Sequence, residues 1–164
     1  GLAEASTIRA GNAWGVKNLE YLKKGAKVAA SCSVLFSFIA MIFLITFGDM
    51  LVSFYVDIDD PARDQIIYIG ALLLIAAALF QLVDGGQAMA LGLLRGIQDT
   101  TVPMLITILS YWLVGIPSAY FFAFVINWDS LGIWAGLGTG LGFAATLLGA
   151  RFLVLVNSDR KVTL

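Results

Sequence analysis

Long apolar runs, separated by short polar stretches, dominate the sequence. Four runs, residues 28–47, 66–94, 104–126 and 131–155, are each long enough to cross a bilayer as a helix. Residues 1–8 read as the last turns of a helix that begins upstream, so we expect a fragment of a longer membrane protein. The pattern predicts an all-α, polytopic transmembrane helix bundle with four full spans and the end of a fifth.

The stretch between the stub and the first full span, residues 9–27, is polar and basic. Gly11 and Gly15 are expected to end the first helix, because glycine interrupts helices. The chain can then restart as an amphipathic helix that lies in the membrane interface. The lysines of that later part are Lys23, Lys24 and Lys27.

Composition supports a membrane location. The chain is 60% hydrophobic and 13% charged, and its mean hydropathy is +0.91, whereas about a quarter of the residues in soluble domains are charged. Four apolar helices in a chain of 164 residues would leave too little polar surface to cover them in water. The net charge of −1 gives no sign of nucleic-acid binding.

Several kinds of chemistry are excluded by residue type. The chain has no histidine and one cysteine, Cys32, which rules out an intrachain disulfide, a thiolate metal cluster and a Ser-His triad. No paired acids or nucleophile with a base are visible either, so the sequence predicts neither an enzyme nor a metal site.

Charge is distributed unevenly between the two ends of the predicted spans. Lys and Arg gather in residues 9–27, at Arg95 and in the C-terminal tail, whereas the loop 48–65 is acidic apart from Arg63. Cytoplasmic loops of membrane proteins carry an excess of Lys and Arg. We therefore expect the basic segments and the C-terminus to lie in the cytoplasm.

Asp84 lies inside the apolar run 66–94, with Arg95 at the polar end of that run. At helical rise it is roughly 16 Å from Arg95, near the middle of a hydrocarbon layer about 30 Å thick. A carboxylate there costs at least about 2.5 kcal/mol. Gln81 and Gln87 flank it in one polar arc. The arc can line a wet cavity and hold an ion or a proton, or it can glue two helices together.

The run 104–126 contains a further set of polar and helix-bending positions. Pro117 lies in mid-run and is expected to kink the helix. Thr107, Ser110 and Tyr111 place hydroxyl groups toward the inner half, where they serve either a substrate in the cavity or hydrogen bonding to their own backbone. The last run carries glycine at every fourth position, a pattern for close helix packing, in Gly132, Gly136 and Gly140.

Two further acids, Glu4 and Asp99, have an arginine nearby in the sequence. Glu4 is a second possible intramembrane acid, although an ion pair with Arg9 or an interfacial position also explains it. Arg95 and Asp99 are four residues apart and are expected to pair across their loop, in a structural role.

Four motifs in collinear order resemble the multidrug and toxic compound extrusion (MATE) transporters. Residues 4–15 resemble the signature A-A-S-x-R-V-G-N-A-L-G that follows the eighth helix of that family. Residues 80–103 resemble the tenth helix and its loop, residues 110–117 the eleventh helix, and residues 132–136 the twelfth. Ala10 and Trp14 replace the family's usual Val and Leu, and Glu4 replaces a small residue.

The resemblance implies a transporter of twelve helices in two lobes, with a central cleft that opens alternately to each side. This chain would hold the end of helix eight and helices nine to twelve of the C-terminal lobe. Asp84 matches the tenth-helix acid of that lobe's cation site, whose seventh-helix acid would lie upstream. Its partners would be small organic substrates, the N-terminal lobe, the seventh helix and membrane lipid.

The resemblance implies a protein that exports drug-like, often cationic compounds in exchange for H⁺ or Na⁺. It implies a location in the bacterial inner membrane and no cofactor other than the coupling ion. Two alternatives stay open. A related flippase for lipid-linked oligosaccharide would carry more basic residues in its cavity helices. A membrane scaffold without transport activity would tolerate replacement of Asp84.

The charge asymmetry gives a topology that labelling can test. In a Cys32→Ser background, a membrane-impermeant thiol reagent added to intact cells should label cysteines introduced into loop 57–64. It should leave cysteines in loop 98–101 unlabelled, because that loop is expected to be cytoplasmic. The opposite labelling pattern would reverse the orientation.

Overall fold

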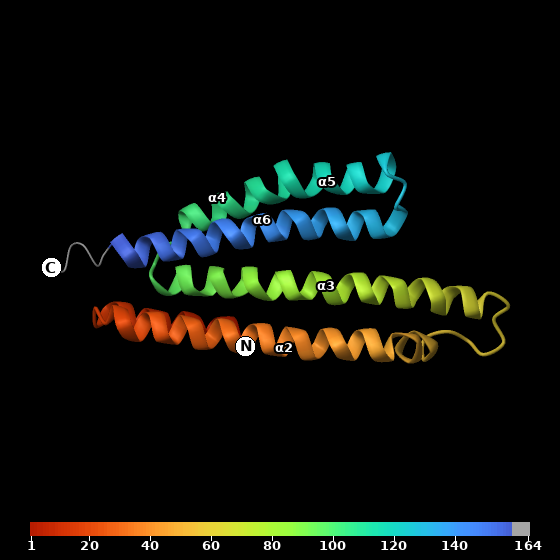
Figure 1. The fold of residues 1–164 in the computed structure, drawn as a ribbon, viewed down its shortest axis with the longest axis horizontal. Helices are drawn as coiled ribbons and strands as arrows, with labels where there is room; N and C mark the ends of the chain where they lie inside the picture. The colour runs from red at the N-terminus through yellow and green to blue at the C-terminus, as the bar shows by residue number, and fades with distance from the viewer. Residues whose placement is uncertain (159–164) are drawn as a thin grey trace.

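The computed structural model describes residues 1–158, and the last part of the basic tail, residues 159–164, lies outside the described residues. Helices run side by side along one long axis (Figure 1). In chain order they are α1 Leu2–Gly15, α2 Leu19–Ser53, α3 Arg63–Gly96, α4 Thr101–Leu109, η1 Ser110–Gly115, α5 Ile116–Tyr120, η2 Phe121–Val125 and α6 Asp129–Ser158, where η marks a π-helical stretch.

The fold class predicted from the sequence is confirmed. Four helical segments are long and apolar enough to cross a membrane: Leu19–Ser53, Arg63–Gly96, Thr101–Val125 and Asp129–Ser158. Residues 1–158 contain no strand. Three helices extend past both ends of the apolar run that predicted them, because polar residues can continue a helix beyond the hydrocarbon layer. The span Thr101–Val125 begins before its run, 104–126, and ends one residue before the end of that run.

The expected helix break at Gly11 is wrong. Helix α1 continues to Gly15, and the turn that follows includes Lys17 with a φ of 55°. Gly11 lies against α3, where a Cβ added to it would be 3.3 Å from the carbonyl oxygen of Gly96. The glycine therefore allows two helices to approach each other and does not end the first one.

The separate interfacial helix expected after that break is also absent from the described chain. Residues 19–27 form the first turns of α2, which continues without interruption to Ser53. The side chain of Asn18 caps this long helix by accepting a hydrogen bond from the backbone N–H of Tyr21 at 2.9 Å. The basic residues are thus fixed on the end of a rigid span.

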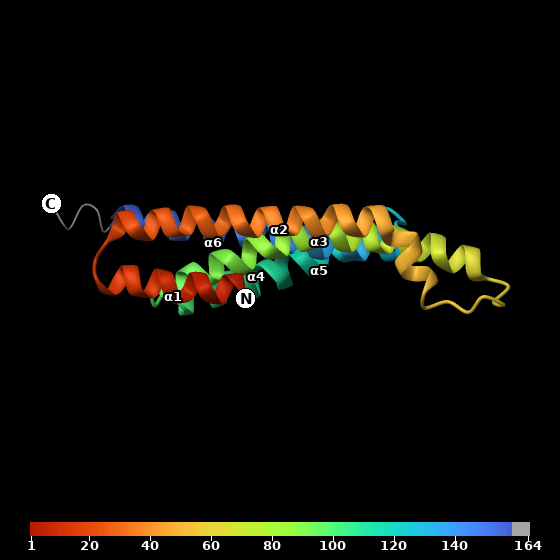
Figure 2. The same cartoon turned by 90° about the horizontal axis from the view of Figure 1, so that it is seen from below.

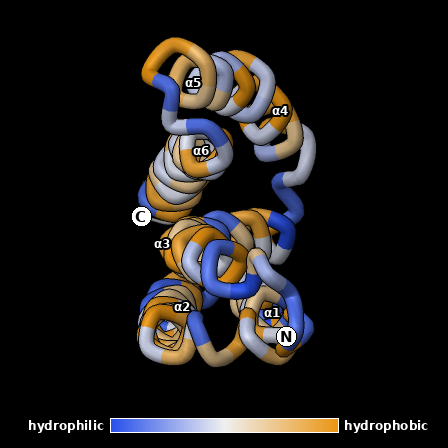
Figure 3. The backbone as a smooth tube through the Cα atoms, turned by 90° about the vertical axis from the view of Figure 1, so that its right-hand side faces the viewer, coloured by the Kyte–Doolittle hydropathy of each residue, from blue (hydrophilic) through white to orange (hydrophobic). Residues whose placement is uncertain are grey.

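Helix α3 is the centre of the arrangement. Viewed along the long axis, it lies between α1 and α2 on one side and α6 on the other, with α4 and α5 beyond (Figure 3). Helix α1 is short and runs beside one half of α2 and α3 only (Figure 2).

The most extensive hydrophobic core lies at the end of the bundle where α1, α2, α3 and α6 meet. Its buried members are Ala10, Ala13, Leu22, Ala26, Met89, Ala90, Leu93, Leu94, Ile97, Leu148, Phe152 and Val156. Many apolar side chains elsewhere are exposed, including Phe36 at 61% and Leu79 at 55%. In a bilayer such surfaces are covered by lipid or by further helices.

The segment Thr101–Val125 is one helical span with two π-helical interruptions. The first, η1, ends at Gly115, two residues before Pro117, which has no N–H to donate to the preceding turn. The span is bent between α4 and α5 (Figure 1), and bends of this kind commonly accompany proline and π turns.

Helix α6 packs directly on the backbone of this bent span, as the glycine spacing predicts. A Cβ added to Gly132 would lie 2.5 Å from the backbone nitrogen of Ala123, and one added to Gly140 would lie 2.6 Å from the Cα atom of Gly115. One added to Gly136 would overlap the backbone of Ala119. Only glycine permits this approach.

Gly136→Ala should therefore lower the free energy of unfolding of the detergent-solubilised protein by about 1–3 kcal/mol, since the rigid backbone of Ala119 cannot move aside cheaply. Gly149→Ala is the matched control, because nothing lies within 4 Å of a Cβ at that position of the same helix. It should be neutral or slightly stabilising. Equal thermal stability of the two variants would contradict the proposed backbone contact.

Candidate functional site

Asp84 lies on α3, well inside the apolar part of that helix. Its side chain is exposed, and within residues 1–158 it makes no hydrogen bond or ion pair. Gly85, the next residue, faces α2 instead: a Cβ there would lie 2.8 Å from Oγ of Ser37. Asp84 is thus an intramembrane acid that the described chain does not neutralise.

The polar arc expected around Asp84 is divided between two environments. Gln81 is exposed, as Asp84 is, but Gln87 is only 3% exposed. Its Oε1 atom accepts a hydrogen bond from the hydroxyl of Tyr111 at 2.8 Å. Successive positions three apart on a helix are rotated by about 60°, so Gln87 is turned from the exposed face toward η1.

The hydroxyl groups of the bent span differ in their surroundings. Thr107 donates to the carbonyl oxygen of Pro103 at 2.9 Å, which is the backbone alternative left open by the sequence. It also lines a groove of about 220 Å³ together with Arg95 and Thr100. Only Tyr111 links the bent span to the Asp84 helix by a side-chain hydrogen bond within the described chain.

Ser110 is a polar residue that sequence reasoning undervalued. It is 1% exposed, and its Oγ has no hydrogen-bond partner among the described residues. Its carbonyl oxygen lies 3.3 Å from the position of a Cβ added to Gly140 of α6. A buried hydroxyl without a partner is costly, and here it lies at the start of η1, next to Tyr111.

The expected pair between Arg95 and Asp99 is wrong. Asp99 instead accepts a hydrogen bond from Nε of Arg151 on α6 at 2.5 Å. The side chains of Asp99 and Arg151 are 16% and 31% exposed. The signal in the sequence was Arg151 itself, which interrupts an otherwise apolar run. Its partner could not be deduced, because it lies 52 positions away.

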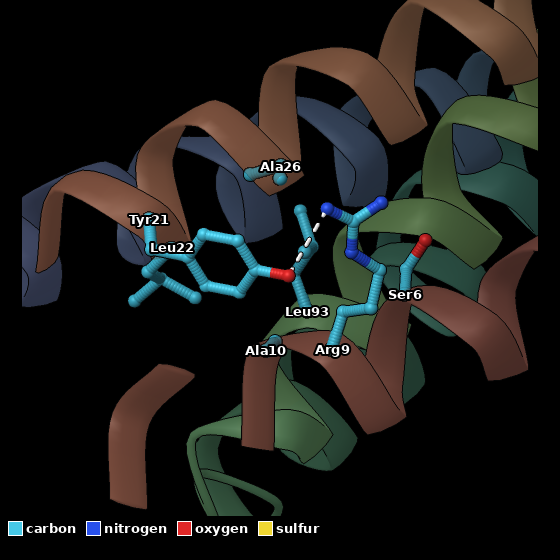
Figure 4. Close-up of a pocket in the computed structure, with 8 residues that line it drawn as sticks. Ser6, Arg9, Ala10, Tyr21, Leu22, Ala26 and Leu93 are labelled. Atoms are coloured by element: carbon cyan, nitrogen blue, oxygen red, sulfur yellow. Dashed lines mark hydrogen bonds between the residues drawn. The ribbon is translucent and has the colours of Figure 1, made fainter. Parts of the chain in front are cut away.

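The pair between Glu4 and Arg9 is also wrong. Glu4 makes no ion pair with Arg9 among the described residues, and its side chain is 86% exposed. Arg9 turns instead toward α2, where its Nη2 donates to the hydroxyl of Tyr21 at 3.4 Å (Figure 4). Arg9 therefore contacts a residue of another helix and not Glu4, which precedes it on the same helix.

A cavity of about 810 Å³ lies between α3 and α6, beginning one residue from Asp84 at Val83. It is mostly apolar. Phe80 and Trp134 both line it, and their rings contact each other edge to face with centroids 5.4 Å apart. Such a surface suits an apolar or aromatic ligand. Residues 1–158 hold no group of three or more His, Cys, Asp or Glu side chains that could bind a metal ion.

Comparison with known proteins gives a consistent result. The family model described as MatE matches residues 1–121. The chain is 38% identical over 153 residues to a probable multidrug resistance protein NorM of Mesorhizobium japonicum, covering 93% of this chain and 33% of that protein. It is 36% identical to the probable NorM protein of Rhizobium meliloti, covering 96% of this chain and 34% of that one.

Solved structures share the fold. An inward-facing multidrug resistance MATE family transporter of the MOP superfamily matches 99% of this chain and 36% of its own, with a TM-score of 0.87 at 18% identity. An outward-facing one matches 97% of this chain and 35% of its own, with a TM-score of 0.84 at 19% identity. The chain spans about a third of the length of these relatives. The match of the family model over most of its residues shows that this chain belongs to the MatE family.

Proposed function

We propose that the protein containing this chain is a cation-coupled antiporter that exports drug-like, often cationic, organic compounds by alternating access. The observation that carries the proposal is Asp84, an exposed carboxylate within an apolar span that finds no partner in residues 1–158. Family membership and the names of the NorM relatives, which refer to multidrug resistance, support export as the direction of transport.

An intramembrane carboxylate can couple two movements because its charge is costly in a low-dielectric surrounding. Binding of H⁺ or Na⁺ to Asp84 lowers that cost and favours one arrangement of the helices, and release favours the other. An incoming cationic substrate competes for the same negative charge. Each substrate that leaves is thereby exchanged for an ion that enters.

The surroundings of Asp84 suit an amphipathic substrate. The cavity between α3 and α6 offers the aromatic rings of Phe80 and Trp134 to an apolar body, and the carboxylate lies on the next part of the same helix. This division between an apolar wall and one charge favours organic cations over oligosaccharides.

The alternatives are weaker. A lipid-linked oligosaccharide flippase would need basic groups within the spans, whereas Arg95 and Arg151 lie near the helix ends, and the charge in the middle is acidic.

The protein is an integral membrane protein, since its four candidate spans and its MatE family relatives agree. A bacterial inner membrane with the basic ends in the cytoplasm fits the NorM relatives.

Asp84→Asn in the full-length protein should abolish drug resistance in cells and ion-driven export in proteoliposomes. The amide keeps size and hydrogen bonding but cannot exchange a proton or neutralise a cation. Asp84→Glu should keep partial activity, and Asp59→Asn, in the exposed loop before α3, is the matched control. Normal export by Asp84→Asn, with membrane expression unchanged, would show that Asp84 is not the coupling site, whereas absence of export by the unmodified protein would favour the scaffold alternative.

Tyr111→Phe should reduce the export rate about three- to tenfold at unchanged expression, since it removes an interhelix hydrogen bond and leaves Gln87 buried without its donor. The melting temperature should fall slightly as well. Tyr120→Phe, at an exposed tyrosine of the same span, is the control. Export and melting temperature equal to those of the control would remove Tyr111 from the coupling machinery.

A further inference from the structure

Arg9 is held in a defined position between α1 and α2. Its guanidinium carbon lies 5.5 Å from the centroid of the Tyr21 ring, and its Nη2 donates to the Tyr21 hydroxyl at 3.4 Å. Gly25 leaves room beside it, because a Cβ added there would be 4.0 Å from Nε of Arg9. The cation therefore lies across two helices over a shallow hollow (Figure 4).

No carboxylate of the described chain neutralises this cation. Glu4 makes no ion pair with Arg9 within residues 1–158, and Glu20 lies 2.9 Å from Nζ of Lys24. Arg9 has no ion pair within residues 1–158. Since the tyrosine contact occupies only one edge and one face of the guanidinium, its remaining N–H groups are free to bind an anion.

The surroundings of Arg9 combine positive charge with exposed apolar surface. Residues 9–27 carry one acid, Glu20, and the basic residues Arg9, Lys17, Lys23, Lys24 and Lys27. Ile8, the chain neighbour of Arg9, is 65% exposed, and Val28, about one helical turn beyond Gly25 on α2, is 55% exposed. Clusters of basic residues next to the end of a span attract anionic lipid, and exposed apolar side chains at the same level favour a ligand that has both a charged head and a hydrocarbon tail.

We propose that the Arg9–Tyr21 site binds the headgroup phosphate of an anionic phospholipid in the adjoining leaflet. The guanidinium fork donates to two phosphate oxygens, as arginine commonly does, and Tyr21 holds that fork in place. The first acyl segments lie against Val28 and Ile8. The neighbouring lysines add attraction without fixing the lipid. The bound lipid would contact both α1 and α2. This proposal does not depend on which compound the protein transports.

The test uses the full-length protein in nanodiscs containing phosphatidylglycerol and phosphatidylcholine. Native mass spectrometry after gentle detergent transfer counts the phosphatidylglycerol molecules retained, and titration of phosphatidylglycerol gives the affinity. Arg9→Gln should weaken retention about tenfold, which exceeds the roughly fivefold expected from losing one basic residue near a charged surface. Lys17→Gln removes the same charge from the same segment, at a residue that does not line the hollow, and should weaken retention fivefold at most.

A second variant separates the site from simple charge attraction. Tyr21→Leu keeps every basic residue but removes the ring and hydroxyl that fix Arg9, so it should lower retention severalfold while the protein elutes as a folded species. Equal retention by Arg9→Gln and Lys17→Gln would overturn the proposal in favour of diffuse attraction. Displacement of the lipid by millimolar inorganic phosphate would also overturn it and indicate a site for free phosphate.

Discussion

Direct contact between helix backbones is the constraint on which this structure depends. Lipid tails are as apolar as leucine, so membrane helices gain little from burying apolar side chains against each other and associate through close packing and polar contacts. Gly92 and Gly96 of α3 lie against α1, where a Cβ would be 2.7 Å from the carbonyl oxygen of Ala3 and 2.6 Å from that of Thr7. The glycines of α6 bring the bent span equally close, so α3 and α6 form a pair to which the other helices attach.

Polar contacts reinforce these same interfaces. The hydroxyl of Thr7 donates to the carbonyl oxygen of Gly92 at 2.9 Å, next to the glycine contact of α1 with α3. At the end of the bundle that holds the core, Arg151 binds Asp99 and Lys23 donates to Asn157. Each of these contacts joins segments that are far apart in the sequence, and together they stabilise this end of the bundle.

The sequence predicted the spans because a bilayer imposes a length and a composition on each helix separately. It also predicted where α6 would pack, since glycine spacing along one helix records how close a neighbour must come. It failed at Gly11, at the Arg95–Asp99 pair and at the Glu4–Arg9 pair, where a nearby residue was the obvious partner and a distant helix supplied another. The burial of Gln87 could not be predicted for the same reason. The position of Tyr111 relative to α3 decides which side of the polar arc is buried, and that position is not visible in the sequence. The place of Asp84 was predictable, whereas its coupling role stays a prediction.

The loop between α2 and α3 contrasts with the one between α3 and α4. In the latter, Asp99 binds Arg151 of α6, so a change in loop length would displace a contact between the loop and that helix. In the former, the side chains of Asp57 and Asp60 accept only from backbone groups two residues further along the chain. Among the described residues, neither side chain makes a hydrogen bond or an ion pair to a distant helix. An epitope or a small reporter domain inserted between Ile58 and Asp59 would therefore be tolerated, which makes this loop a natural attachment point for fiducial binders in electron microscopy of the whole protein.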